Sequence, residues 1–97
     1  MKLGSKDKAY LKGLGHHLKP IIQIGKGGIE QNFIENLESS LGRHELIKIK
    51  VLENCAYDKT ALAENIEKAT AGNIVQIIGK TLLFYRPFKK DPQIKLP

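Results

Sequence analysis

Four consecutive residues, Gly25-Lys26-Gly27-Gly28, have the composition of a phosphate-binding turn. They follow the apolar run at residues 21–24, which reads as a strand, and precede residues 29–41, whose apolar residues recur at helical spacing. A glycine-rich turn from a strand into a helix leaves backbone N–H groups without partners at the helix start, where the helix dipole adds partial positive charge. Lys26 adds a full positive charge inside the turn. The pattern therefore predicts an anion site built largely from backbone.

The same glycines have a second interpretation, which is purely structural. A short G-x-x-G turn can serve only to turn the chain and to let a helix and a strand pack closely. The lysine inside the turn has no acidic neighbour there, and the flanking sequence is strongly basic. These two features favour a contact with a phosphate backbone, but both interpretations stay open on the residues alone.

Other spacings that could support catalysis or metal binding do not fit their motifs. Gly79-Lys80-Thr81 resembles the end of a nucleotide-binding P-loop, but Ile74 stands where that motif requires glycine. His16-His17 are adjacent, so on a helix they would point about 100° apart. His44-Glu45 lacks a second histidine at the zinc-protease spacing. The sequence therefore predicts no catalytic site, no metal site and no cofactor.

The charge is distributed unevenly along the chain, whose net charge is +6. Residues 1–28 carry six lysines against one aspartate, and residues 79–97 carry five basic groups against one aspartate. Residues 29–78 carry five basic and eight acidic groups. If the two ends meet in space, the protein has a basic face suited to a polyanion and an acidic face opposite.

Periodicity and turn residues divide the chain into seven elements. The clearest are an amphipathic helix at 29–41 and a strand at 45–53 in which apolar residues and lysines alternate. Gly79-Lys80 suits a two-residue type II′ hairpin turn. The predicted order is α-β-α-β-α-β-β, over residues 5–15, 21–24, 29–41, 45–53, 58–70, 74–78 and 81–86.

This order predicts an α/β fold in which helices cover a mixed four-stranded sheet. The two strand–helix–strand units should each form a parallel pair, and the last two strands should form an antiparallel hairpin. The first helix should bury an apolar stripe of Leu11, Leu14 and Leu18. Alternation along the last strand should turn one of Phe84 and Tyr85 outward.

Length and composition indicate one globular domain. The chain has 97 residues, of which 41% are hydrophobic and 27% charged. No apolar run approaches the ~20 residues that cross a bilayer, and the first residues lack the apolar segment of a signal peptide. The single cysteine, Cys55, cannot form an intramolecular disulfide, which fits a reducing, cytoplasmic setting. We expect one domain over residues 1–90 and an extended or mobile tail over residues 91–97.

Three blocks of the sequence resemble the YhbY-type RNA-binding proteins, also called the CRM domain family. Residues 18–28, which end in the glycine turn, are similar to the family's signature. Residues 44–51 resemble its second strand, and residues 75–86 resemble its closing hairpin. The blocks keep the family's order and spacing. Lys80 departs from the pattern, which more often has histidine in this turn, but it keeps a donor and adds charge.

The resemblance implies a fold similar to the C-terminal domain of bacterial translation initiation factor three, and RNA binding through a glycine loop comparable to that of KH domains. For bacterial stand-alone members it implies association with precursors of the large ribosomal subunit. It implies an RNA-binding site made of the loop and a surrounding basic surface: Gly25, Lys26, Gly27, Gly28, Lys12, Lys19, Lys80 and Arg86.

We therefore expect a cytoplasmic, monomeric RNA-binding protein that acts as an assembly factor on the precursor of large-subunit ribosomal RNA. It should have no catalytic activity and no membrane or small-molecule partner. The basic first helix, the hairpin tip and the tail should extend the contact. One alternative is a protein-binding adaptor on ribosomal particles, docking through the acidic helical face. Another is a small enzyme acting on a phosphorylated ligand, which the lack of a catalytic constellation disfavours.

Overall fold

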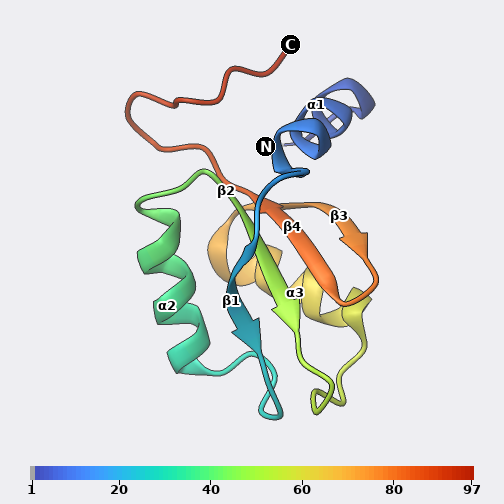
Figure 1. Ribbon diagram of the computed structural model, residues 1–97. Helices are drawn as coiled ribbons and strands as arrows, with labels where there is room; N and C mark the ends of the chain where they lie inside the picture. Colours follow the sequence, from blue (N-terminus) through green and yellow to red (C-terminus); the bar gives the residue numbers. More distant parts are fainter. Residues whose placement is uncertain (1) are drawn as a thin grey trace.

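Three helices pack against a mixed four-stranded sheet in the computed structural model, which describes residues 2–97 (Figure 1). The elements confirm the predicted order and the α/β class. They are α1 (Ser5–Gly15), β1 (Pro20–Ile24), α2 (Gln31–Leu41), β2 (Leu46–Val51), α3 (Lys59–Thr70), β3 (Asn73–Ile78) and β4 (Thr81–Tyr85). No helix within residues 2–97 combines the length and the apolar character needed to span a bilayer.

The strands lie in the order β1-β2-β4-β3. β1 and β2 are parallel, as predicted, and β4 is antiparallel to both β2 and β3. The predicted parallel pair between β2 and β3 is wrong, because β4 turns back at the hairpin and lies between them. At the hairpin turn Gly79 has a φ of 54°, the positive value that the first central residue of a type II′ turn requires.

The sheet has a hydrophobic core on each face. α2 and α3 cover one face, and α1 crosses part of the other (Figure 1). The larger core includes Ile22, Ile24, Phe33, Leu37, Leu41, Ile47, Ile49, Val51, Leu62, Ile66, Leu82 and Phe84. The smaller core, under α1, includes Leu3, Leu11, Leu46, Val75, Leu83 and Tyr85. On β1 and the lower part of β2, the face not covered by α2 and α3 stays open to solvent, with Ile21, Gln23 and Lys50 exposed.

Two expectations about buried side chains are wrong. Phe84 and Tyr85 are both buried, because Phe84 packs under α2 and α3 while Tyr85 packs under α1. In α1 the buried line runs from Leu11 to Gly15, one helical turn apart, so Leu14 lies beside it and is 42% exposed. Leu18 follows the end of the helix, where helical spacing no longer applies, and is exposed as well.

The two ends of the chain meet above the sheet. The carboxylate of Glu45, which is buried, accepts hydrogen bonds from the backbone N–H groups of Phe88, Gln93 and Ile94 at 2.7, 2.9 and 2.7 Å. Ile94 packs against the core under α1. Residues 91–97 form no helix or strand but are held against the domain by these contacts. The domain boundary at residue 90 stays a prediction.

Candidate functional site

The glycine loop forms an exposed turn between β1 and α2. The N–H of Gly28 donates to the carbonyl of Gly25 at 3.0 Å, which closes the turn and places Lys26 and Gly27 at its tip. Both tip residues are exposed to solvent. The loop lies at the end of the sheet where β1 and β2 finish, at the bottom of Figure 1. The structure therefore presents this turn to any partner that approaches that end.

Gly28 is required by the backbone and by its surroundings. Its φ of 69° lies in the left-handed region, where a side chain causes strain. A Cβ at this position would also lie 2.7 Å from Cε2 and 2.8 Å from Cδ2 of Tyr57, which is closer than such atoms approach. A tyrosine from the loop between β2 and α3 thus packs directly on the glycine loop.

Several backbone donors near the loop have no partner within residues 2–97. Within the described residues, the N–H groups of Lys26 and Gly27 make no hydrogen bond. α2 begins at Gln31, two residues later than expected, and its N-cap Glu30 provides no side-chain cap for the first helical N–H groups. The first hydrogen bond of the helix is the one that the N–H of Ile34 donates to the carbonyl of Glu30, at 3.1 Å. Free N–H groups and the helix dipole together make this segment attractive to an anion.

The site also contains a carboxylate. The end of the Glu30 side chain occupies the space over the Cα of Gly27. The backbone of Gly27 itself is unstrained, because its φ does not lie in the positive region. An anion that used the Gly27 N–H would have to displace the Glu30 carboxylate or share the loop with it. Glu30 is exposed, so its side chain has room to move.

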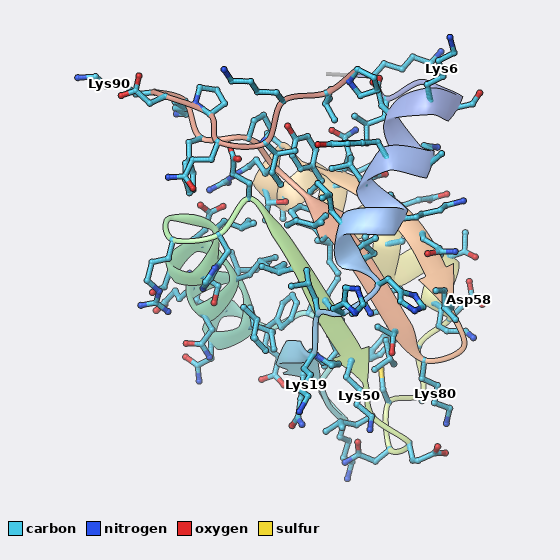
Figure 2. The ribbon with its side chains drawn as sticks, turned by 45° about the horizontal axis from the view of Figure 1, so that its top comes forward. Lys6, Lys19, Lys50, Asp58, Lys80 and Lys90 are labelled. Atoms are coloured by element: carbon cyan, nitrogen blue, oxygen red, sulfur yellow. The ribbon has the colours of Figure 1, made fainter. Side chains whose placement is uncertain are left out.

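Lysines of β2 and of the hairpin lie near the same end of the sheet. Lys50 on β2 pairs with Gln23 of β1 and with Thr81 of β4, which follows Lys80 at the hairpin. Figure 2 shows Lys19, Lys50 and Lys80 extending together in the lower part of the view, with Lys6 and Lys90 at the upper end. The N–H of Val51 donates to the carbonyl of Lys80 at 2.7 Å, so the hairpin tip is fixed beside the end of β2.

An exposed ion pair moderates this positive charge. Lys80 pairs with Glu53, whose side chain is 87% exposed. The hydrogen bond and the charge of Lys80, with a smaller contribution from Lys50, lower the pKa of the Glu53 carboxyl below its usual value. Because the side chain of Glu53 is 87% exposed and that of Lys80 is 47% exposed, the pair is weak and an external anion can replace Glu53.

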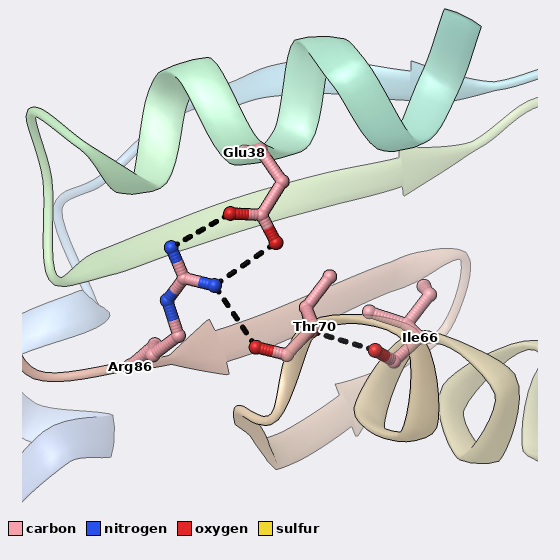
Figure 3. A network of polar contacts seen from close by, with 4 residues as sticks. All are labelled: Glu38, Ile66, Thr70 and Arg86. Carbon is pink, nitrogen blue, oxygen red and sulfur yellow. Dashed lines mark hydrogen bonds and ion pairs between the residues drawn. The ribbon is translucent and has the colours of Figure 1, made fainter. Parts of the chain in front are cut away.

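Arg86 lies away from this group and has partners of its own. Its two terminal nitrogens donate to the two carboxylate oxygens of Glu38, both at 3.0 Å, and one also donates to the carbonyl of Thr70 at 2.9 Å (Figure 3). These bonds join β4 to α2 and α3. Of the other expected contact residues, Lys80 lies at the hairpin beside the end of β2, whereas Lys19 precedes β1 at the end of that strand opposite the glycine loop. Lys12 is exposed in the last turn of α1.

Two residues near the loop were not among the expected contacts. The alternation along β2 already indicated that Lys50 points away from the main core, so its place beside the site had a signal in the sequence. No signal in the sequence indicated Tyr57. A single aromatic residue in a loop belongs to no periodic pattern, and its contact with Gly28 joins residues 29 positions apart. Among residues 2–97, no group of three or more His, Cys, Asp or Glu side chains is placed to hold a metal ion.

The chain matches the CRS1 / YhbY (CRM) domain over residues 3–86, which includes the loop, the sheet and all three helices. It is 43% identical over 95 residues to the Bacillus subtilis protein named "Probable RNA-binding protein YqeI", covering 98% of this chain and 99% of that one. It is 38% identical over 95 residues to a Haemophilus influenzae protein named "RNA-binding protein", covering 98% of this chain and 95% of that one.

A solved structure extends the similarity to three dimensions. The solution structure of the hypothetical protein SAV1595 from Staphylococcus aureus superposes with a TM-score of 0.84 at 45% sequence identity. The match covers 99% of this chain and all of the other. The similarity in sequence and the similarity in fold thus extend over nearly the whole chain. The chain belongs to the CRS1 / YhbY (CRM) domain family.

Proposed function

We propose that this protein binds RNA without catalysing a reaction, and that its glycine loop holds a backbone phosphate. The observation that carries the proposal is the turn at residues 25–28, whose tip presents free N–H groups and a lysine at the edge of a basic surface. Backbone N–H groups and lysines are the donors that phosphate oxygens accept. Lys26 and the amides of Lys26 and Gly27 contact one phosphate in this arrangement.

The neighbouring lysines extend the contact along the strand. Lys50 and Lys80 lie beside the end of the sheet that carries the loop, and Lys19 lies at the start of β1. An RNA chain that contacts all three runs from the loop along the open face of β1 and β2. Contacts of this kind are to the backbone, so they provide affinity and orientation rather than base specificity. Lys12 remains a predicted contact, whereas for Arg86 we propose a structural role. Arg86 would have to give up bonds to Glu38 and Thr70 in order to reach a phosphate.

The relatives support the same function. The Bacillus subtilis and Haemophilus influenzae proteins are both named as RNA-binding proteins, and each is similar to this chain over nearly its full length. We further propose that the RNA is the precursor of large-subunit ribosomal RNA and that the protein acts in the cytoplasm as an assembly factor. The support for this finer assignment is the resemblance of residues 18–28, 44–51 and 75–86 to the YhbY-type proteins.

The alternative, a protein-binding adaptor, receives less support from the acidic helices than their charge suggests. Glu38 of α2 is paired with Arg86. Glu67 of α3 accepts a hydrogen bond from the N–H of Ile74 at 2.8 Å. Two of the acidic side chains therefore hold the fold together and are not free to attract a partner.

Binding of labelled large-subunit ribosomal RNA fragments tests the proposal. Lys26→Ala and Gly27→Asp should each weaken binding by about tenfold or more, because a charge-assisted contact is lost or an acid is placed at the tip. Asn65→Asp is the control for an added acid, since Asn65 is exposed on α3 and is not among the predicted contacts. Equal affinity of the folded loop variants and the wild type would exclude the glycine loop as the phosphate site.

A further inference from the structure

Tyr57 is a large aromatic side chain left open to solvent beside the proposed phosphate site. It is 56% exposed, whereas Phe33, Phe84 and Tyr85 are all buried. The chain around it is fixed, because the carboxylate of the next residue, Asp58, accepts hydrogen bonds from the N–H groups of Thr60 and Ala61 at 3.1 and 3.2 Å. The exposure of Tyr57 therefore belongs to an ordered loop end.

The glycine loop supports one edge of the Tyr57 ring. Cε2 and Cδ2 lie 2.7 and 2.8 Å from the point where a Cβ of residue 28 would be, so the ring sits on the space that glycine leaves empty. More than half of the residue's surface remains accessible. The ring is consequently held beside the turn that carries Lys26 while most of its surface stays open.

Two lysines share a hollow with Tyr57. The hollow has a volume of about 230 Å³ and is lined by Tyr57, Asp58, Lys59 and Lys80, among other residues. Lys80 is also paired with Glu53 at its rim. The ammonium group of Lys59 donates to the carbonyl of Gly79 at 2.5 Å, which holds α3 and the hairpin tip together at this hollow. The open ring thus contacts the glycine loop and shares a hollow with the lysines at the hairpin.

We propose that Tyr57 stacks on an unpaired nucleobase of single-stranded RNA whose adjoining phosphate sits on the glycine loop. The inference rests on the proposed RNA-binding function and adds that the RNA bound at this position is single-stranded. Aromatic rings flanked by cations bind unstacked bases in this way, and every base offers a face, so the subsite selects single-stranded over double-stranded RNA without selecting a base.

The protein contains no tryptophan, which makes a direct optical test available. In Tyr57→Trp the new indole is the sole tryptophan, and stacking on a base should quench its fluorescence when single-stranded RNA is added. The same RNA annealed into a duplex should quench it little. Tyr10→Trp is the matched control, because Tyr10 is also exposed, at 43%, but lies on α1.

Affinity measurements complete the test. Tyr57→Ala should weaken binding of single-stranded RNA by about 5- to 100-fold, and Tyr57→Phe should retain it, because the stacking face is kept. Tyr10→Ala should bind as the wild type does. Circular dichroism checks that each variant is folded.

The outcomes separate this inference from the proposed function. If the wild type binds RNA, Lys26→Ala weakens binding, and Tyr57→Ala binds normally with no quenching in Tyr57→Trp, the stacking site is wrong while the phosphate site stands. If the wild type binds neither single-stranded nor double-stranded RNA, the proposed function itself fails. Equal quenching of Tyr57→Trp by single-stranded and duplex RNA would also overturn the stacking inference.

Discussion

At the scale of single residues, two glycines of the loop should differ in how well they tolerate a side chain. Gly28→Ala should destabilise the protein by about 1–3 kcal/mol, because it places a side chain at positive φ against the Tyr57 ring. Gly27→Ala should change stability by less than about 0.5 kcal/mol, since it meets only the movable end of Glu30. Urea denaturation of both variants checks this difference. Equal losses would mean that the loop conformation is assigned wrongly.

Glu30 is the residue in the loop region that should oppose binding. Its carboxylate lies over Gly27, where a phosphate would approach, so like charges repel there. Glu30→Gln keeps the shape of the side chain and removes the charge. We expect it to bind RNA more tightly than the wild type, by about 2- to 5-fold, in a titration at low salt. Glu35→Gln, an exposed position on α2, is the control. Weaker binding by Glu30→Gln would show that this carboxylate assists the contact.

At the scale of elements, Arg86 connects β4 to α2 and α3. Arg86→Ala removes the paired bonds to Glu38 and the bond to Thr70, so the free energy of unfolding should fall by about 1–3 kcal/mol. Arg86→Lys cannot form the paired geometry and should recover only part of this loss.

RNA affinity separates the structural role of Arg86 from a role in binding. Measured at a temperature where the variant is folded, Arg86→Ala should bind within about twofold of the wild type. A large loss of affinity that Arg86→Lys restores, with little change in stability, would instead place Arg86 in the RNA contact.

Because β4 is buried on both faces, we predict that the stability of the fold decreases at alkaline pH. Burial, followed by the charges of Glu45 and Asp7, raises the pKa of Tyr85 above its usual 10.0. The unfolded chain therefore ionises this phenol first, and stability is lost as the pH rises from 10.0 through the higher folded value. Tyr85→Phe has no proton to lose, so its stability relative to the wild type should increase above pH 10.0. Unfolding in urea at neutral and alkaline pH measures this difference, and a pH-independent difference would contradict it.

Local signals predicted the elements well, and contacts distant in sequence were the ones missed. Alternation along β2 and the turn residues at 79–80 located the strands correctly, because both are short-range effects. The insertion of β4 between β2 and β3, and the hydrogen bonds of Glu45 to residues 88–94, depend on tertiary packing that no local period shows. Around the candidate site, the sequence predicted the turns at residues 25–28 and 79–80, whereas the position of Tyr57 beside Gly28 follows only from the assembled fold.

At the scale of the whole molecule, the positive charge forms two regions rather than one face. The ends of the chain do meet, as Leu3, Ile94 and Leu96 share one core, but they meet at the end that carries Lys6 and Lys90. Lys50 and Lys80 extend toward the other end, which carries the glycine loop, and Lys19 lies at the start of β1 (Figures 1 and 2). The expected extension of the RNA contact over the tail therefore requires RNA that reaches along the molecule, whose longest dimension is 37 Å.

The measurement that tests the central claim most directly is the salt dependence of RNA affinity for two triple variants of equal charge. One replaces Lys19, Lys50 and Lys80 by glutamine, and the other replaces Lys6, Lys89 and Lys90. For single-stranded RNA, each lost phosphate contact lowers the slope of log affinity against log salt by about 0.7, so the first variant should lose about 2 units of slope. The second should lose less than about 1. A larger loss in the second variant would place the RNA at the chain ends and contradict the assignment of the glycine loop as its binding site.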